Sequence, residues 1–130
     1  MLAAVVRGLL VFGCGGAGCL ARYLVALAVG RRAFPYATLL VNVVGAFLIA
    51  LILELALARR DVPAHLQVAL TTGFLGGFTT YSSFNYETTR LLLTGEVARG
   101  LVNLAVTVVG AFAAGLGGLA VARWLAGGAG

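Results

Sequence analysis

The chain has 130 residues, of which 62% are hydrophobic and 10% are charged, and its mean hydropathy is +1.07. Soluble globular domains do not carry so much apolar surface, so the composition indicates an integral membrane protein. All nine basic residues are arginines, and the formal net charge is +5. Because no basic cluster is interleaved with aromatic residues, we attribute this excess to helix ends among lipid headgroups and expect no nucleic-acid partner.

Four apolar stretches are long enough to cross a bilayer, which takes about 20 residues. The connections between them are too short to form a soluble domain, and the first stretch is too long for a signal-peptide core. We therefore expect one all-α domain, residues 1–130, in the inner (plasma) membrane of the cell. The predicted spans are Leu2–Val29, Tyr36–Ala58, Leu66–Leu93 and Ala98–Leu125.

Two cysteines, Cys14 and Cys19, lie in the first apolar stretch without the spacing of metal ligands. We predict that both are small buried hydrophobic residues and form neither a disulfide nor a redox pair. No nucleophile lies beside a base, and neither paired acids nor a phosphate-binding loop appears. The sequence therefore does not indicate an enzyme.

The third span contains an unusual segment, Gly73 to Glu87, which reads GFLGGFTTYSSFNYE. It combines three glycines with four threonine and serine hydroxyl groups, and the aromatic residues Tyr81 and Phe84 lie beside those hydroxyls. Glycine destabilises a helix interior by about 1 kcal/mol relative to alanine, and exposed hydroxyl groups gain nothing from hydrocarbon. Non-helical backbone is tolerated at membrane depth only where protein or a polar pathway surrounds it. We predict a broken helix whose break lines a route for a polar solute.

Two polar pairs lie one helical turn apart in other spans. Thr38 and Asn42 share a face of the second span, and Asn103 and Thr107 share a face of the fourth. The Asn42 amide either forms an interhelical hydrogen bond or offers its N–H groups to a permeating anion. For the second pair we favour a polar lining.

Charged residues near the spans allow several roles. Arg22, close to the end of the first span, is either a structural anchor or part of a functional site. Glu54 is expected to reach the membrane interface or an arginine, and Glu87 to lie at a vestibule. Four arginines belong to one end of the bundle and four or five to the other, so the positive-inside rule has little bias to act on. This balance favours insertion in both orientations and an antiparallel dimer, unless a partner sets the topology.

Three motifs carry a resemblance to a known family. They are GGAGCLARY from Gly15 to Tyr23, ATLLVNVVGAF from Ala37 to Phe47, and TTGFLGGFTTYSSF from Thr71 to Phe84. Together they resemble the Fluc/CrcB fluoride channels over nearly the whole chain. The resemblance implies four transmembrane helices with a broken third helix, assembled as an antiparallel dual-topology homodimer. It also implies passive fluoride export through two pores and a central structural sodium ion.

The same resemblance implies roles for individual residues. Asn42 would be the pore asparagine, and Tyr81 and Phe84 would present ring edges to fluoride. Backbone carbonyls of Gly76 and Thr79 from both subunits would hold the sodium ion. The polar lining of the pore would comprise Thr38, Thr80, Ser82 and Thr107, and the vestibule would include Arg22 and Glu87.

The sequence departs from the family pattern at three positions. Tyr81 replaces a common phenylalanine, Ser83 stands where threonine is usual, and Ala111 replaces a hydroxyl residue one turn beyond Thr107. These departures concern the lining of the pore and do not remove it.

Two other functions stay open: a small proton-coupled exporter, although no acid lies deep in the first span, and a membrane assembly subunit whose polar residues only pack.

Overall fold

The computed structural model describes residues 1–59 and 62–127, in which all regular elements are helical. Three helices are long and apolar enough to cross a membrane. They are α1 (Leu2–Val29), α2 (Tyr36–Arg59) and α6 (Val97–Gly127). The prediction of an all-α integral membrane protein agrees with this architecture, and each of these helices begins and ends within two residues of its predicted span.

The predicted third span is divided into shorter elements. It comprises α3 (Ala64–Val68), the π-helix η1 (Ala69–Leu75), α4 (Gly76–Phe78) and α5 (Tyr81–Leu93). The first three run on without interruption, and α5 follows only after two residues in extended conformation. The predicted break in this span is therefore confirmed.

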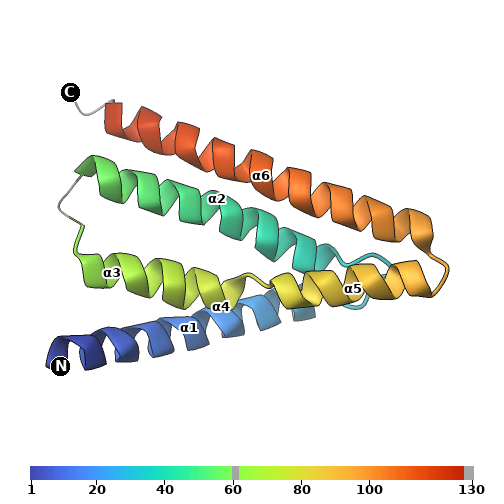
Figure 1. Cartoon of the computed structure of the whole chain (residues 1–130), viewed down its shortest axis with the longest axis horizontal. Coiled ribbons are helices and arrows are strands. Elements are labelled where there is room, and N and C mark those ends of the chain that lie inside the picture. The colour runs from blue at the N-terminus through green and yellow to red at the C-terminus, as the bar shows by residue number, and fades with distance from the viewer. Residues whose placement is uncertain (60–61, 128–130) are drawn as a thin grey trace.

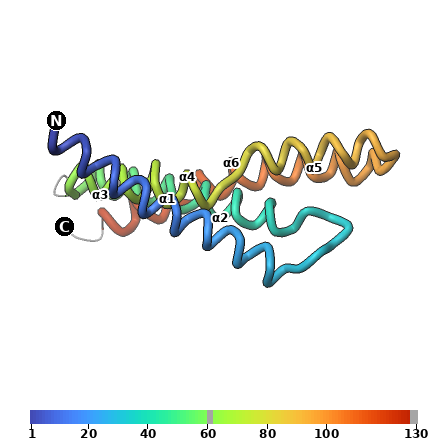
Figure 2. The backbone as a smooth tube through the Cα atoms, turned by 90° about the horizontal axis from the view of Figure 1, so that it is seen from below, coloured from blue at the N-terminus to red at the C-terminus, as the bar shows by residue number. Residues whose placement is uncertain are grey.

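The helices lie side by side in an elongated bundle (Figure 1). The N-terminus and the end of α6 lie at one end, where α2 ends and α3 begins, and the α1–α2 and α5–α6 turns lie at the other. Seen from below, the α5–α6 hairpin diverges from the α1–α2 turn at that second end (Figure 2). The break lies where this divergence starts, so the polar segment is at the inner end of the region between the two hairpins.

The break has a local cause in two threonines. Thr79 has φ −85° and ψ 158°, and Thr80 has φ −151° and ψ 109°, so neither continues the helix. The side chain of Thr80 then caps α5, because its Oγ1 accepts a hydrogen bond from the Ser83 N–H at 3.2 Å. Threonine is a favoured residue at a helix N-terminus, where this bond is worth about 1 kcal/mol.

Glycines allow α1 to pack directly against the backbone of the broken segment. A Cβ added at Gly18 would overlap the Phe74 carbonyl oxygen, and one added at Gly77 would overlap the Gly15 carbonyl oxygen. A similar close approach joins α2 and α6, where Gly118 faces the Phe47 carbonyl oxygen. Such contacts bring helix backbones together in membranes, where the hydrophobic effect does not drive helix association.

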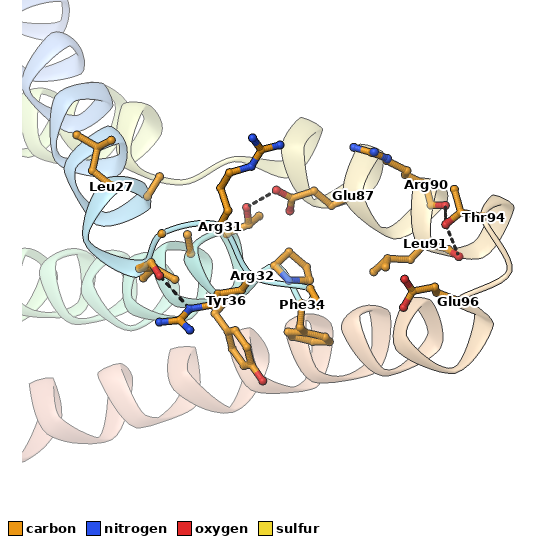
Figure 3. A pocket seen from close by; sticks show the side chains of 17 residues that line it. Leu27, Arg31, Arg32, Phe34, Tyr36, Glu87, Arg90, Leu91, Thr94 and Glu96 are labelled. Carbon is orange, nitrogen blue, oxygen red and sulfur yellow. Dashed lines mark hydrogen bonds between the residues drawn. The ribbon is translucent and has the colours of Figure 1, made fainter.

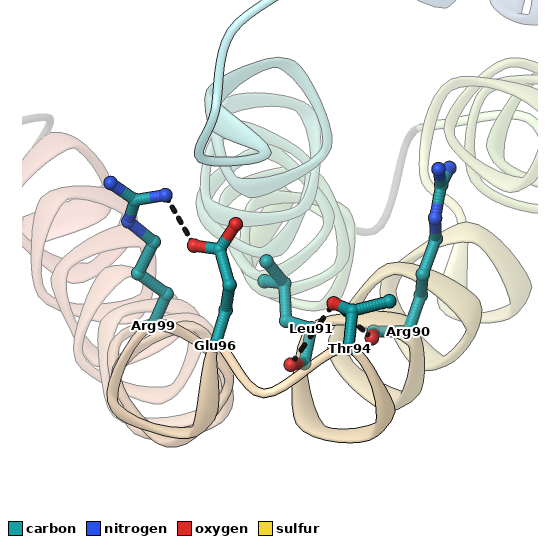
Figure 4. A network of polar contacts seen from close by, with 5 residues as sticks. All are labelled: Arg90, Leu91, Thr94, Glu96 and Arg99. Carbon is teal, nitrogen blue, oxygen red and sulfur yellow. Dashed lines mark hydrogen bonds and ion pairs between the residues drawn. The ribbon is translucent and has the colours of Figure 1, made fainter.

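A short turn joins α5 to α6 (Figure 4). The Thr94 hydroxyl donates to the carbonyls of Arg90 and Leu91 at 2.9 and 3.4 Å, and Gly95 follows with φ 85°. Glycine adopts this left-handed conformation without steric cost, so it suits the residue after a helix end. An ion pair between Glu96 and Arg99 lies at the start of α6.

Two minor predictions can be compared with this fold. Cys14 is half-buried, but Cys19 is exposed, so the prediction that both are buried is wrong for Cys19 in the single chain. Its Sγ lies beside Gly77 of α4, 3.2 Å from where a Cβ at Gly77 would stand, and this one contact leaves the rest of the side chain exposed. Glu54 does reach an arginine, since its Oε1 accepts a hydrogen bond from Arg123 Nε at 2.9 Å.

Candidate functional site

A small cavity beside the break collects polar side chains from α1, α2 and α5. Its volume is about 170 Å³. Four of the predicted site residues line it, namely Arg22, Thr38, Thr80 and Glu87, together with Ser83 and three apolar residues. These residues are far apart in the sequence, so the fold brings together much of the predicted site.

Thr38 and Glu87 join α2 to α5 across this cavity. The Thr38 hydroxyl donates to Glu87 Oε1 at 3.0 Å, and Thr38 is only 8% exposed. The second carboxylate oxygen, Oε2, is buried without a hydrogen-bond partner among the residues that the structure describes. This oxygen is therefore available to a further donor or to water.

The Asn42 amide binds the backbone of the break at two points. Its Oδ1 accepts from the Thr80 N–H at 2.8 Å, and its Nδ2 donates to the Thr80 carbonyl at 3.1 Å. The amide thus pairs with one peptide as a neighbouring β-strand would. The sequence allowed Asn42 either to form an interhelical hydrogen bond or to offer its N–H groups to an anion. The interhelical hydrogen bond is present in the single chain. The second N–H of Nδ2 takes no part in this pairing, so a role toward an anion remains compatible with it.

Arg22 binds the opposite side of the break. Its Nε donates to the Gly77 carbonyl at 3.0 Å. In a continuous helix that carbonyl would accept from the N–H four residues later, which lies beyond the break. Arg22 therefore satisfies a carbonyl that the break exposes, at the end of α4 where a cation is favoured by the helix dipole. Arg22 therefore acts as the structural anchor that the sequence analysis considered.

Two further carbonyls lose their usual helical partners at the break. In a continuous helix the Gly76 carbonyl would accept from the Thr80 N–H, and the Thr79 carbonyl from the Ser83 N–H. Instead, Thr80 N–H donates to Asn42 and Ser83 N–H donates to the Thr80 hydroxyl. The carbonyls of Gly76 and Thr79, which are the predicted sodium ligands, therefore do not receive the N–H groups that a continuous helix would give them.

Hydroxyl groups around the start of α5 form a connected group. Thr80 Oγ1 donates to Ser83 Oγ at 3.0 Å and lies 3.3 Å from Ser82 Oγ. Ser82 is exposed on the single chain, whereas Thr80 and Ser83 are half-buried. Ser83 was not among the predicted pore residues, although it belongs to the same run of hydroxyl side chains.

The two aromatic residues of the motif differ sharply in exposure. Tyr81 is 77% exposed, and Phe84 is 6% exposed. Their rings meet edge to face, with centroids 5.8 Å apart and planes inclined at 60°. Aromatic rings carry a positive edge, which can attract an anion. In the single chain, Phe84 lies inside the bundle and Tyr81 lies on its surface.

A wider cleft of about 800 Å³ continues from the small cavity toward the end of the bundle that carries the turns. It lies between the α1–α2 connection and the α5–α6 hairpin, and Thr38 and Glu87 line both spaces. Figure 3 shows Glu87 between the side chains of Arg31 and Arg90. Three arginines and two glutamates line this cleft, namely Arg31, Arg32, Arg90, Glu87 and Glu96, so basic side chains are in excess of acidic ones by one. A small positive excess in a cleft favours the approach of anions.

Thr107 lies apart from both of these spaces. It is 5% exposed, and its hydroxyl donates to Asn103 Oδ1 at 3.4 Å within α6. Asn103 in turn binds Thr88, a buried residue of α5 that sequence reasoning did not single out. A signal for Thr88 was present, because it lies one helical turn after Phe84 and so shares its face.

Comparisons with known proteins agree with the motifs. Residues 9–119 match the model of a family described as CrcB-like protein, Camphor Resistance (CrcB). A Geobacter metallireducens protein named fluoride-specific ion channel FluC is 51% identical over 114 residues, 85% of this chain and 92% of the relative. A protein of the same name from Anaeromyxobacter dehalogenans is 46% identical over 126 residues, 95% of this chain and 100% of the relative.

Proposed function

The chain belongs to the CrcB family, and from this premise we propose that it is a fluoride-specific ion channel of the cell membrane. The observation that carries the proposal is the identity of about half of the aligned residues to proteins named as fluoride channels, over nearly the full length of both chains. We further propose that the channel is passive, lets fluoride leave the cytoplasm across the inner membrane, and has no catalytic activity.

The polar residues near the break support this proposal because they are mostly uncharged donors. Fluoride is small and strongly hydrated, so a pore must replace its water with close donors that do not retain the ion. Hydroxyl and amide groups meet this requirement. We propose that Asn42, Tyr81 and Phe84 contact the ion, with the lining completed by Thr38, Thr80, Ser82 and Thr107. Arg22 and Glu87 would form the vestibule with the wider cleft.

A central structural sodium ion is the second part of the proposal. Its support is that the donors expected for the carbonyls of Gly76 and Thr79 bind Asn42 and Thr80 instead. Carbonyl oxygens at a helix break suit a small hard cation. We propose that these carbonyls hold sodium together with the same carbonyls of a second copy, which would fix the two breaks against each other.

An antiparallel homodimer with two pores is the third part. At the end of the bundle where α1 begins and α2 and α6 end, the arginines are Arg7, Arg59 and Arg123, and at the other end they are Arg31, Arg32, Arg90 and Arg99. Arg60 is the fourth arginine that the sequence assigns to the first of these ends, and it lies outside the described residues. Because the two ends carry similar numbers of arginines, the positive-inside rule gives neither orientation a clear preference, which supports insertion in both. The exposed Tyr81 and Ser82 are then available to complete a pore with the second copy.

Fluoride efflux from reconstituted vesicles tests the channel directly. Vesicles loaded with potassium fluoride or potassium chloride are treated with valinomycin, and an ion-selective electrode follows the released anion. We expect rapid fluoride efflux and little chloride efflux. Phe84→Leu should slow fluoride efflux while leaving the size of the assembly in detergent unchanged. A wild-type protein without fluoride efflux would reject the proposal and favour an assembly subunit.

The same vesicles separate a channel from a proton-coupled exporter. Potassium fluoride is placed at the same concentration inside and outside, valinomycin holds the membrane potential near zero, and a pH gradient is then imposed. A passive channel moves no net fluoride under these conditions. Net fluoride movement driven by the pH gradient, and abolished by a proton carrier, would instead support coupling to protons.

Sodium and orientation need separate tests. Thermal unfolding of the detergent-solubilised protein should occur at a higher temperature in sodium chloride than in potassium chloride, because an ion bound only to the folded state stabilises it. Equal unfolding temperatures would contradict the sodium site.

For orientation, a single cysteine is added after the last residue in a Cys14→Ala, Cys19→Ala background. This cysteine should react with an impermeant reagent in both inside-out and right-side-out vesicles. Labelling in only one kind would contradict dual topology.

A further inference from the structure

A buried string of polar side chains joins α5 to α6. Asn103 is 1% exposed, and Thr88 and Thr107 are 6% and 5% exposed. Asn103 Nδ2 donates to Thr88 Oγ1 at 2.8 Å, and Thr88 Oγ1 donates to the Phe84 carbonyl at 2.7 Å. The Thr107 hydroxyl adds a longer bond of 3.4 Å to Asn103 Oδ1. The string therefore connects α6 to the backbone of Phe84.

The Thr88 hydroxyl is the central atom of this string. Threonine in a helix often donates to the carbonyl four residues earlier, and this bond alone would not involve a second helix. Here the same oxygen also accepts a hydrogen bond from Asn103. Burying an amide or hydroxyl without partners in a membrane costs several kcal/mol, so the two side chains are strongly tied to each other.

Besides this string, α5 is joined to α2 by the hydrogen bond from Thr38 to Glu87, and the Asn42 amide holds the Thr80 peptide just before α5. The helix nevertheless packs mainly on α6 rather than on α2. Figure 2 shows that α5 and α6 leave the other helices together. The position of Phe84 along the proposed pathway therefore depends on how α5 is attached to α6.

We propose that Thr88 and Asn103 are positioning residues that set the place of the Phe84 ring through the Phe84 backbone. This inference rests on the proposed function, since it concerns how the channel aligns one of its pore residues. This positioning role differs from the interpretation favoured by the sequence, in which Asn103 and Thr107 form a polar lining. A lining requires Asn103 but gives no role to Thr88, whereas positioning requires both residues as a pair.

A double-mutant cycle distinguishes these roles. Thr88→Val and Asn103→Leu should each lower fluoride efflux by about tenfold, the change expected for loss of one well-made hydrogen bond. The double variant should be no slower than either single variant, because each change breaks the same connection. Thr88→Ser keeps the hydroxyl and should retain wild-type efflux. Thr89→Val, the same change at the neighbouring exposed position, is the matched control.

A second measurement reports the ring itself. 4-Fluorophenylalanine is introduced at Phe84, and its fluorine NMR signal is recorded in detergent. Thr88→Val and Asn103→Leu should move this signal in the same direction, whereas Thr89→Val should leave it in place. Thr88→Ala replaces Thr88→Val if the valine variant does not assemble.

Two results would overturn the inference. The first is slow efflux in Asn103→Leu with normal efflux in Thr88→Val. The second is an unchanged fluorine signal in both variants. Failure of the proposed function has a different signature, because the unaltered protein would then release no fluoride while the fluorine spectra would still decide whether Thr88 and Asn103 position the ring.

Discussion

The two halves of the broken helical segment, which runs from Ala64 to Leu93, are held in place by different means. The first half, η1 and α4, lies against α1 through glycines that bring backbones into contact. The second half, α5, lies against α6 through buried hydroxyl and amide groups. Backbone contact leaves no side chain that can adjust, whereas hydrogen-bonded side chains fix direction and still permit small movements. The first half is therefore a rigid base, and the second carries the aromatic residues of the proposed pore.

The break is where these two modes of attachment meet. Asn42 from α2 binds the peptide after the break, and Arg22 from α1 binds a carbonyl before it. Each uses a polar side chain to replace bonds that a continuous helix would make within itself. The comparison between the halves predicts where a single added methyl group will lower the stability of the protein most.

Gly18→Ala should have the largest effect. Its Cβ would overlap the Phe74 carbonyl oxygen, and a backbone atom cannot move without shifting the helix. We expect a loss of about 3 kcal/mol of stability, at the upper end for overpacking. Gly13→Ala is the control, since nothing lies within 4 Å of the added atom. Thermal unfolding in detergent measures both variants, and equal unfolding temperatures would show that α1 does not pack on the backbone of η1.

Gly45→Ala should have an intermediate effect that a second change relieves. Its Cβ would overlap Thr79 Cγ2, a methyl group at the break. We expect a loss of about 2 kcal/mol, because the threonine side chain is held by its hydroxyl bond to the Leu75 carbonyl. Thr79→Ser removes the methyl group and keeps the hydroxyl, so the double variant should regain most of the stability. Additive losses in the unfolding temperatures would rule out this contact.

Gly100→Ala tests the second half and should have a smaller effect. Its Cβ would come within 2.7 Å of Leu92 Cδ2 and 2.8 Å of Leu92 Cγ, which belong to a side chain that can turn, whereas the nearest backbone atom, the Leu92 nitrogen, is farther away at 3.3 Å. We expect a loss of about 1 kcal/mol, at the lower end for overpacking. If unfolding showed a loss as large as that of Gly18→Ala, the two halves would not differ in rigidity.

Glu54→Gln should have the smallest effect on stability of these variants. Glu54 and Arg123 form an ion pair between α2 and α6, with 24% and 70% of their side chains exposed. Exposed ion pairs contribute at most about 1 kcal/mol, so the unfolding temperature should hardly change. A large decrease would mean that this pair is shielded from water in the assembled protein.

Several features of the protein followed from residue patterns alone. Apolar runs of sufficient length predicted α1, α2 and α6 because the bilayer thickness determines how many residues a span needs. Glycines and hydroxyl residues from Gly73 to Glu87 predicted the break, because they are unfavourable in a lipid-facing helix. Residue patterns also placed Thr38 and Asn42 on one face of α2 and Glu87 at a vestibule, but only the resemblance to a family assigned the three residues to one pathway.

Only the tertiary structure decided which partners the polar groups choose. Asn42 binds the Thr80 peptide, Arg22 binds the Gly77 carbonyl, and Thr88 joins Asn103 to Phe84. Helical periodicity tells which residues share a face, but it does not tell which neighbouring helix that face meets or at what height. Those choices depend on how closely glycines let the backbones approach, and that distance exists only once the helices are packed together.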